Sequence, residues 1–270
     1  MKRKIIALLL LCAMLMAAMI GCTAEDGSDL EYVLAKEKLV VGITYYAPID
    51  FKDENGTLIG FDHDLAEAVC KKLGVTAVFQ EIDWNTKENE LNSKTIDVIW
   101  NGMTVTPDRA EAMSLTKNYM LNKQVVVTTK KLADSVTAIA DLGGKKGAAE
   151  AGSAGESMIK GNDALKAGLV SVQDQATALL EVKSLTSDYC VIDAVMANYL
   201  VGEGTDFAEL VILPELLGAE DEYYAAACRK GSDLTAKINE ILVELYKDGT
   251  VDTIAAKYGL TDVIVPIEAD

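Results

Sequence analysis

The residues best suited to do chemistry in this chain lie in one stretch, DVIWNGMTVTPDR, which ends at Arg109. Its apolar run at residues 98–100 is typical of a short buried strand, which an Asn-Gly pair then ends. Thr106 followed by Pro107 is typical of a helix N-cap and first helical position. The pattern therefore predicts Arg109 in the first turn of a helix.

A cation in the first helical turn opposes the helix dipole, at a cost of roughly 0.3–1 kcal/mol. Such an arginine is favourable when an anion joins it, because the helix N–H groups and the guanidinium then point at one negative charge. This arrangement suits a small carboxylate. The alternative is a surface arginine paired with Asp108 or Glu111.

Alternating strands and helices must position this arginine, and the alternation continues along most of the chain. Strands are predicted at residues 39–43, 75–82, 98–100, 123–130, 148–149, 169–172, 189–192 and 223–228. Helices are predicted at residues 62–73, 175–182, 194–200 and 234–247, with another beginning near 152–155. The pattern indicates an α/β protein with mainly parallel sheets flanked by helices.

The two halves of this pattern are similar. Residues 94–99 and 185–190 each follow a helix and enter an apolar strand with a polar residue at its far end. In open α/β sheets, ligands bind at the carboxyl ends of the strands, so these polar residues are candidates for a shared cleft. Extended crossings near 123–130 and 223–228 would join two lobes and form a hinge of two adjacent strands.

The N-terminus is typical of a secretory signal. A basic segment at residues 2–4 precedes the almost wholly apolar residues 5–20, which are too few for a membrane-spanning helix. The sequence Met-Ile-Gly-Cys ending at Cys22 resembles a bacterial lipobox, with methionine where leucine is usual. We therefore expect a lipidated Cys22 and a polar tether at residues 23–29, the alternative being an ordinary secreted protein.

Composition argues against several functions. The formal charge is −17, and removing the three basic residues of the signal gives −17 − 3 = −20, which disfavours direct binding to nucleic acid or anionic lipid. Cys70, Cys190 and Cys228 lack metal-ligand spacing and are expected to be small core residues rather than disulfide partners. His63 has no metal-binding cluster around it, and the loop at 152–155 lacks the Gly-Lys-Ser/Thr of a nucleotide-binding loop.

Six motifs occur in order along the chain: VVGITYYAPIDFKDENGTLIGFDHDLAEAV, IDW, DVIWNGMTVTPDR, DLGGKK with AGSAGES, DYCVIDAVMANYL and RKGSDLTAKINEIL. Their order and spacing resemble the extracellular solute-binding proteins (family 3 type) of polar amino-acid ABC transporters. The resemblance implies a periplasmic-binding-protein-like fold, in which two α/β lobes close on an amino acid. The implied division is a signal peptide at 1–21, a lipidated N-terminus and tether at 22–37, a first lobe at 38–126 and 225–270, and a second lobe at 127–224.

The resemblance also implies roles for individual residues. Arg109 matches the arginine that grips the ligand α-carboxylate, with Thr104 beside it, and Asp193 matches the acid that pairs with the ligand ammonium. Without the family, Asp193 is equally typical of an N-cap for the helix that follows it. Gly102 matches a position whose backbone carbonyl accepts from the ligand ammonium, and Ser153 and Ala154 match donors to the ligand carboxylate. Tyr46 and Trp84 match the aromatic walls of the site, although without the family they could equally be packed at its rim.

Departures from the family leave the ligand open. Ala154 offers only a backbone N–H where a hydroxyl is common, Ile49 replaces a usual phenylalanine and Tyr224 a usual glycine. Glu150 and Asn101 are placed to reach the ligand side chain, and Glu150 favours a ligand with a hydrogen-bond donor or a cation. Basic, amide and cystine-like amino acids all remain compatible with this pattern.

These observations together indicate a monomeric substrate-binding component of an importer and not an enzyme. A zwitterion needs a cation on one side and a carboxylate on the other, and Arg109 and Asp193 are expected on different lobes. A ligand that contacts both lobes then favours the closed state, with no metal or cofactor. We expect a free polar or charged L-amino acid as ligand, permease subunits as partners, and a lipid-anchored location on the outer face of the bacterial cytoplasmic membrane.

Two other functions fit part of the pattern. A related dehydratase of the cyclohexadienyl type shares the fold, and it would need a proton-transfer carboxylate such as Glu150 and a ligand without an ammonium group. Asp193 as the amine partner argues against that enzyme. The sensor domain of a receptor would need another membrane span and a signalling region, and the sequence leads us to expect neither.

Overall fold

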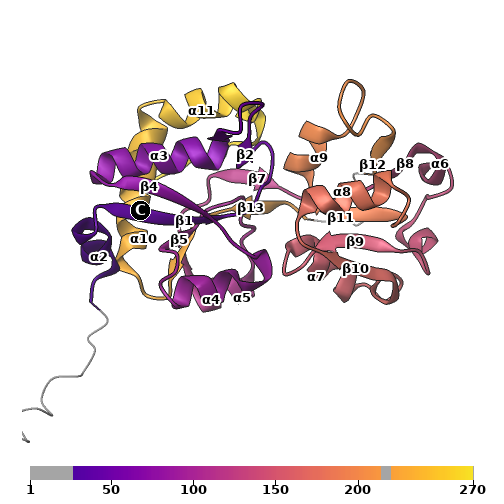
Figure 1. Ribbon diagram of the computed structural model, residues 1–270, viewed down its shortest axis with the longest axis horizontal. Helices are drawn as coiled ribbons and strands as arrows, with labels where there is room; N and C mark the ends of the chain where they lie inside the picture. Colours follow the sequence, from indigo (N-terminus) through magenta and orange to yellow (C-terminus); the bar gives the residue numbers. More distant parts are fainter. Residues whose placement is uncertain (1–26, 214–219, 270) are drawn as a thin grey trace, which may run out of the picture.

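The computed structural model describes residues 27–213 and 220–269, which form two lobes side by side (Figure 1). Each lobe is built on its own five-stranded sheet. The predicted signal peptide at 1–21 and the predicted lipidation site Cys22 lie outside the described residues. The two-lobed α/β architecture confirms the fold class expected from the alternating strands and helices.

The sheet of the first lobe has the strand order β4-β1-β5-β14-β6. β1 pairs in parallel with β4 and β5, whereas β14 is antiparallel to β5 and β6. Helices α3 and α11 lie on the side of this sheet opposite to α4 and α5 (Figure 1). The strands are β1 (Lys38–Ile43), β4 (Thr76–Glu81), β5 (Val98–Ile99), β6 (Met113–Leu115) and β14 (Ala227–Arg229), with a small hairpin of β2 (Phe51–Lys52) and β3 (Leu58–Ile59). The helices are α2 (Asp29–Ala35), α3 (Phe61–Leu73), α4 (Lys87–Asn92), α5 (Pro107–Ala112), α10 (Asp233–Lys247) and α11 (Thr250–Tyr258), with single turns at Trp84–Thr86 and Thr261–Val263.

The sheet of the second lobe has the strand order β10-β9-β11-β8-β12. β9 pairs in parallel with β10 and β11, whereas β8 is antiparallel to β11 and β12. The strands are β8 (Gln124–Thr129), β9 (Gly147–Glu150), β10 (Leu169–Val172), β11 (Tyr189–Asp193) and β12 (Leu210–Leu213). The helices are α6 (Lys130–Ala133), α7 (Ala154–Gly161), α8 (Gln175–Lys183) and α9 (Ala194–Leu200), with single turns at Ile139–Leu142 and Lys166–Gly168.

The lobes are joined by two short antiparallel strands, β7 (Met120–Asn122) and β13 (Glu222–Tyr224). The sequence placed the first crossing near 123–130, but that run forms β8 and lies wholly within the second sheet. The predicted second run, 223–228, is divided between β13 in the hinge and β14 in the first sheet. The predicted boundary at 126/127 therefore falls inside a strand, and the change of lobe occurs a few residues earlier.

The two sheets have the same pattern of strand directions. In the described part of each sheet, one strand is antiparallel to both of its neighbours, β14 in the first lobe and β8 in the second. In both lobes this is the strand that the chain forms directly after it crosses the hinge. The weak sequence similarity of the halves therefore corresponds to a common topology, and the carboxyl ends of the parallel strands can supply residues to one shared cleft.

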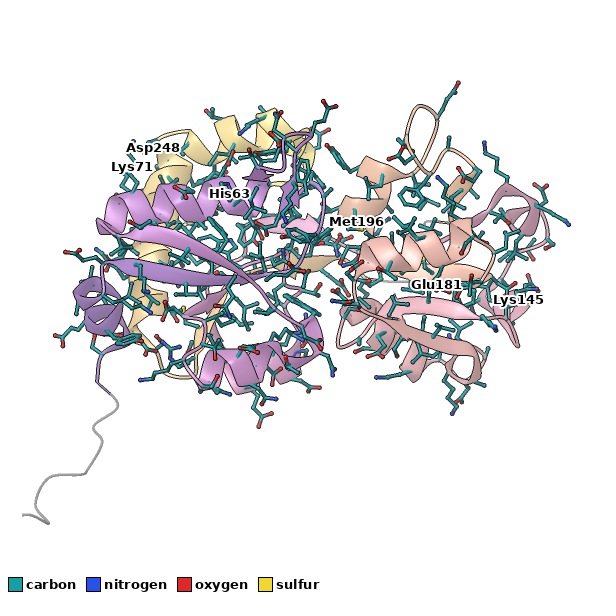
Figure 2. The ribbon with its side chains drawn as sticks, viewed as in Figure 1. His63, Lys71, Lys145, Glu181, Met196 and Asp248 are labelled. Atoms are coloured by element: carbon teal, nitrogen blue, oxygen red, sulfur yellow. The ribbon has the colours of Figure 1, made fainter. Side chains whose placement is uncertain are left out.

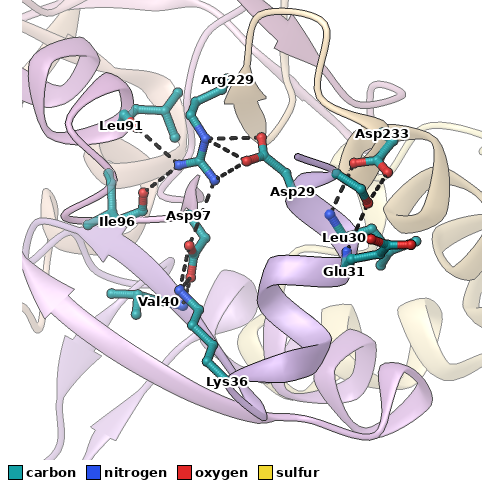
Figure 3. A network of polar contacts seen from close by, with 11 residues as sticks. Asp29, Leu30, Glu31, Lys36, Val40, Leu91, Ile96, Asp97, Arg229 and Asp233 are labelled. Atoms are coloured by element: carbon teal, nitrogen blue, oxygen red, sulfur yellow. Dashed lines mark hydrogen bonds and ion pairs between the residues drawn. The ribbon is translucent and has the colours of Figure 1, made fainter. Parts of the chain in front are cut away.

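Helix α2 corrects the prediction of a tether throughout residues 22–37. Asp29 begins this helix and is buried against Arg229, whose Nε donates to both carboxylate oxygens at 3.0 Å (Figure 3). Asp97 completes the network, because it accepts from Lys36 Nζ at 2.7 and 2.6 Å and lies 3.9 Å from the Arg229 guanidinium. Local composition made this segment look solvated, whereas a distant arginine holds it on the first lobe.

Several minor expectations concern single residues. Cys70, Cys190 and Cys228 are free and buried, which confirms their prediction as core residues. His63 lies on α3 (Figure 2). Its ring stacks on Phe79 with ring centroids 4.4 Å apart, and its Nδ1 is 3.0 Å from the adjacent Asp64 carboxylate. Within residues 27–213 and 220–269, no helix combines the length and apolar character that crossing a membrane requires.

Candidate functional site

The two lobes line a shared cavity whose empty space, part of it open to solvent, is about 340 Å³. Every residue predicted from the sequence to bind ligand lines this cavity. The first lobe contributes Thr44, Tyr45, Tyr46, Trp84, Asn101, Gly102, Thr104 and Arg109, and the second contributes Glu150, Ser153, Ala154, Gln175 and Asp193. The sequence therefore predicted residues from both halves of the chain that line one cavity in the structure. Their contact with a ligand stays a prediction.

Arg109 supplies the positive charge of the cavity. Thr106 caps α5 by accepting from the Arg109 backbone N–H at 3.2 Å, which confirms the predicted helix start. Arg109 lines the cavity and is only 8% exposed, so the alternative of a surface arginine is wrong. Nη1 donates to the carbonyl oxygen of Thr104 at 2.7 Å, and Nη2 donates to that of Gly152, on the opposite lobe, at 3.1 Å. Both acceptors are neutral, and burial lowers the pKa of Arg109.

Asp193 faces the cavity from the carboxyl end of β11, immediately before α9. Its side chain makes no capping hydrogen bond to that helix, so it does not act as the N-cap that the sequence left open. Instead, the carboxylate accepts from the side-chain amides of Gln124, at 2.8 Å, Asn122 and Gln175. Burial raises the pKa of Asp193, while these donors act in the opposite direction by favouring the charged form.

Ser153 and Ala154 bring the N-terminus of α7 to the cavity. Ser153 Oγ accepts from the backbone N–H of Glu156 at 3.0 Å, which satisfies one of the free donors of the first turn. The Ser153 hydroxyl can still donate its own proton, and the Ala154 side chain offers no polar group. This helix end therefore presents N–H groups and a hydroxyl to the cavity, an arrangement that favours an anion.

Two aromatic side chains and a glycine shape the wall of the first lobe. Tyr46 and Trp84 are 3% and 5% exposed, and the hydroxyl of Tyr46 is 2.5 Å from that of Tyr224 on the hinge. Gly102 has φ of +55°, and a Cβ there would lie 2.6 Å from the Tyr46 ring. Only glycine therefore fits this position beside the tyrosine, which leaves the backbone of the Asn101-Gly102 turn close to the cavity.

Asn101 lines the cavity, but its amide is used within the first lobe. Its Oδ1 accepts from the Thr44 backbone N–H at 3.0 Å, and its Nδ2 donates to Asp50 at 2.7 Å and to the Thr44 carbonyl at 2.9 Å. The neighbouring Gly102 N–H donates to buried Asp62 at 2.6 Å. Asn101 therefore fixes the cavity wall, and its predicted contact with a ligand side chain stays a prediction.

Glu150 ends β9 with its carboxyl group at the cavity. The residue is 4% exposed, and its buried Oε1 has no hydrogen-bond partner. Burial and the nearby Asp193 raise the pKa of Glu150, while Lys87 and Arg109 act in the opposite direction. An unpartnered buried oxygen is unfavourable, so Glu150 differs from Asp193, whose carboxylate accepts several hydrogen bonds.

Sequence reasoning missed the three amides that donate to Asp193, those of Asn122, Gln124 and Gln175, and it also missed Lys87. Gln175 donates to Asp193 and lies just beyond the carboxyl end of β10, where the rule applied to the other strands could have found it. Lys87 lies beside the cavity and joins the lobes: its Nζ donates to the carbonyl oxygens of Trp84, at 3.0 Å, and Gly152, at 3.1 Å. Burial lowers the pKa of Lys87 to about 8. No local sequence pattern marks this lysine.

Comparison with known proteins identifies the family. Residues 39–261 match the model of the bacterial extracellular solute-binding proteins, family 3. The chain belongs to this family. It is 30% identical over 256 residues to the arginine-binding extracellular protein ArtP of Bacillus subtilis (strain 168), an alignment that covers 93% of this chain and 96% of that protein.

Solved structures of this family 3 protein's relatives have the same fold. A substrate-binding protein of an ABC uptake transporter from Streptococcus pneumoniae, with bound histidine, is 34% identical and covers 89% of this chain and 100% of its own, with a TM-score of 0.82. An ancestral amino acid-binding protein, described as a precursor of cyclohexadienyl dehydratase, is 31% identical and covers 86% of this chain and 99% of its own, with a TM-score of 0.76. These relatives are binding proteins, which agrees with the function class expected from the sequence.

Proposed function

We propose that this family 3 protein is the extracytoplasmic amino-acid-binding component of an ABC importer and delivers its ligand to the membrane permease. One observation carries the proposal: Arg109 and Asp193, of opposite charge, line one cavity from different lobes. Both are buried, at 8% and 6% exposure. A free amino acid carries a carboxylate and an ammonium on one carbon, so it can satisfy both side chains at once.

The ligand carboxylate is assigned to Arg109 and the N-terminus of α7. Only two guanidinium N–H groups of Arg109 donate to protein acceptors within the described residues, and a guanidinium has five donors. The Ser153 hydroxyl and the Ala154 N–H lie across the cavity. The ammonium is assigned to Asp193 with the Gly102 carbonyl, and the walls to Tyr46 and Trp84.

Closure of the lobes follows from this arrangement. The Gly152 carbonyl of the second lobe already accepts from Lys87 and Arg109 of the first, so the lobes make direct polar contacts. A ligand held by both walls adds a second connection that the open state lacks. Its differential affinity for the closed state then couples binding to closure.

The same proposal includes the lipid anchor and the permease. Cys22 as the lipidated residue rests on the lipobox alone, since it lies outside the described residues. The change Cys22→Ser in the full-length protein should release the mature protein from the membrane fraction, because no helix within residues 27–213 and 220–269 can span a membrane. Retention of the Ser variant in that fraction, or a native Cys22 without lipid by mass spectrometry, would refute the anchor.

A ligand screen tests the binding function. Wild-type protein is heated with each common L-amino acid, and a ligand present at 100 times its Kd should add about 2.7 kcal/mol to the free energy of unfolding. The best ligand is then compared by calorimetry with its α-methyl ester and its N-acetyl derivative, which remove one charge each. Both derivatives should bind at least 10-fold more weakly. No stabilisation by any amino acid, or full affinity for both derivatives, would contradict the proposal.

The dehydratase remains the alternative function, because Glu150 has the raised pKa that a proton donor needs. Asp193 and its amide donors favour a ligand that carries an ammonium group, which argues for binding without chemistry. Incubation of the protein with a cyclohexadienyl substrate should therefore leave the substrate unchanged, beyond its spontaneous decomposition. Turnover that is lost in Glu150→Gln would overturn the assignment as a binding protein.

A further inference from the structure

Glu150 is the acidic side chain of the cavity that the protein itself leaves unpaired. It is 4% exposed, it ends β9 at the cavity, and its Oε1 is buried without a hydrogen-bond partner. A buried carboxyl group in this state is costly, whether it is charged or holds a proton. A cation that enters the cavity would remove this cost, so Glu150 has the properties of a ligand-binding group.

Comparison with Asp193 shows that the lack of hydrogen-bond partners is particular to Glu150 and is not shared by the other acid that lines the cavity. Both acids lie at the carboxyl ends of neighbouring strands, β9 and β11, and both line the same cavity. Asp193 accepts from three side-chain amides, which hold it in a fixed position. Glu150 has no comparable set of donors, although burial is almost equal at the two residues.

The charges of the cavity indicate which ligand would complete it. Among its lining residues Arg109 is cationic, whereas Glu150 and Asp193 are acidic. The α-carboxylate and α-ammonium of a neutral amino acid would balance Arg109 and Asp193 and leave Glu150 unmatched. A third charge on the ligand, positive and on its side chain, would match Glu150.

The nearby lysine does not neutralise Glu150 by direct contact. Lys87 Nζ donates to the carbonyl oxygens of Trp84 and Gly152 and lies 4.9 Å from the Trp84 ring centroid. The other charged groups that act on Glu150 are Asp174, before α8, and the two cavity residues Asp193 and Arg109. In the described part of the chain, none of these groups forms an ion pair with Glu150.

We infer that Glu150 binds the positively charged side-chain end of the ligand, so that this protein selects cationic amino acids such as arginine, lysine and ornithine over neutral ones. The inference rests on the proposed amino-acid-binding function and narrows its substrate class. Glu150 is the specificity-determining residue, while Arg109 and Asp193 bind the groups that all amino acids share.

Arginine and citrulline provide a matched pair of ligands, because they have nearly the same shape and differ in the charge of the terminal group. Calorimetry should show that wild-type protein binds arginine about 10- to 150-fold more tightly than citrulline, the range of a charge-assisted hydrogen bond. Glu150→Gln should reduce this ratio to less than threefold, mainly by weakening arginine. Glu67→Gln is the control, since it removes an exposed acid of α3 that lies outside the cavity lining, and it should leave the ratio unchanged.

Proton release gives a readout that a merely structural role would not change. Burial raises the pKa of Glu150 in the ligand-free protein. A cation that binds beside the carboxyl group should lower this pKa and displace a proton. Calorimetry in buffers of different ionisation enthalpy, at a pH where the empty site holds that proton, should show release with arginine and not with citrulline. The release should disappear in Glu150→Gln.

The outcomes separate this inference from the proposed function. If no amino acid binds, the proposed function fails. If amino acids bind but wild-type protein holds citrulline or glutamine as tightly as arginine, the function stands and the cationic specificity is wrong. Specificity for arginine that survives Glu150→Gln would also overturn the role of Glu150.

Discussion

The first lobe contains two buried arginines, and their surroundings are opposite. Arg229 is saturated: it donates to both carboxylate oxygens of Asp29 and to the carbonyl oxygens of Leu91 and Ile96 (Figure 3). Arg109 has the same 8% exposure but donates only to two neutral carbonyl groups, one of which belongs to the other lobe. Removing one partner of the Arg229 network would leave a buried charge unpaired, whereas Arg109 donates only to neutral groups and keeps donors that a ligand can use.

The same contrast occurs among the acids. Asp97, with two hydrogen bonds from Lys36 and one from the Val40 N–H, is structural, whereas Glu150 has an unpartnered oxygen in the cavity. Function in this protein is therefore indicated less by residue type than by what the fold leaves unsatisfied. Substitutions can test this distinction: those at Arg229, Asp29 or Asp97 should reduce stability, and those at Arg109 or Glu150 should reduce ligand affinity.

Arg229→Met should produce the largest effect, a loss of about 3–5 kcal/mol in the free energy of unfolding, because Asp29 remains as a buried acid without its cation. Amino-acid affinity of the folded variant should change less than threefold. Urea unfolding and calorimetry measure the two quantities. Replacing both partners, as in Asp29→Leu with Arg229→Met, should recover part of the loss. A stability loss below about 1 kcal/mol, typical of a surface pair, would contradict the structural role of Arg229.

Arg109→Ala should have the opposite result. Calorimetry should show affinity reduced by about 100-fold or more, because the ligand carboxylate loses its charged partner. Unfolding free energy should fall by no more than about 1 kcal/mol, since only two bonds to neutral carbonyl groups are removed. Arg109→Lys should recover binding only in part, because an ammonium cannot form the bidentate pair. Lys237→Ala, which removes an exposed cation on α10, should bind like wild type.

Asp193→Asn should weaken ligands that carry an α-ammonium by about 10- to 150-fold, the worth of one charge-assisted hydrogen bond. The side chain makes no capping bond to α9, so that helix should be unaffected, and the circular dichroism spectrum should stay the same. Wild-type affinity of the Asn variant would mean that Asp193 does not pair with the ligand ammonium. An affinity loss for the N-acetyl ligand as large as for the free amino acid would have the same meaning.

Asp62→Asn should produce the smallest effect, a change in how the free energy of unfolding depends on pH. Burial raises its pKa to about 7, from 3.8. The folded state therefore holds a proton that the unfolded state has lost, and the stability this contributes is present at low pH and lost as pH rises toward 7. As the pH rises above the ordinary range of an aspartate, Asp62→Asn should become more stable relative to wild type, measured by urea unfolding, and the neighbouring buried Asp50 acts in the same direction in both proteins. A difference that does not vary with pH would contradict this assignment.

Local sequence patterns predicted the parts of the fold and site that have local causes. Thr106 and Pro107 set the start of α5 and hence the position of Arg109, and the strand-then-helix alternation placed Asp193 at the end of β11. The hinge was harder to place, since β7 and β13 have only three residues each and lie next to longer extended runs.

The remaining features depend on contacts between residues far apart in the chain. Asp29 read as a solvated tether residue because its partner, Arg229, lies 200 positions away. Asn122 and Asp193, 71 positions apart, meet only when the hinge and β11 are assembled, so the amide donors around this acid were not foreseen. Residues whose partners are distant in the sequence can be recognised only in the folded structure, where it is visible which polar groups have hydrogen-bond partners and which do not.

The central claim is that one amino acid joins the two lobes, and small-angle scattering tests it most directly. The radius of gyration of wild-type protein should decrease when the best-binding amino acid of the screen is added to saturation. Arg109→Ala, at the same ligand concentration, should show no such decrease, because the first lobe no longer holds the carboxylate. An amino acid that binds wild type tightly by calorimetry yet leaves its radius of gyration unchanged would contradict closure of the lobes around the ligand.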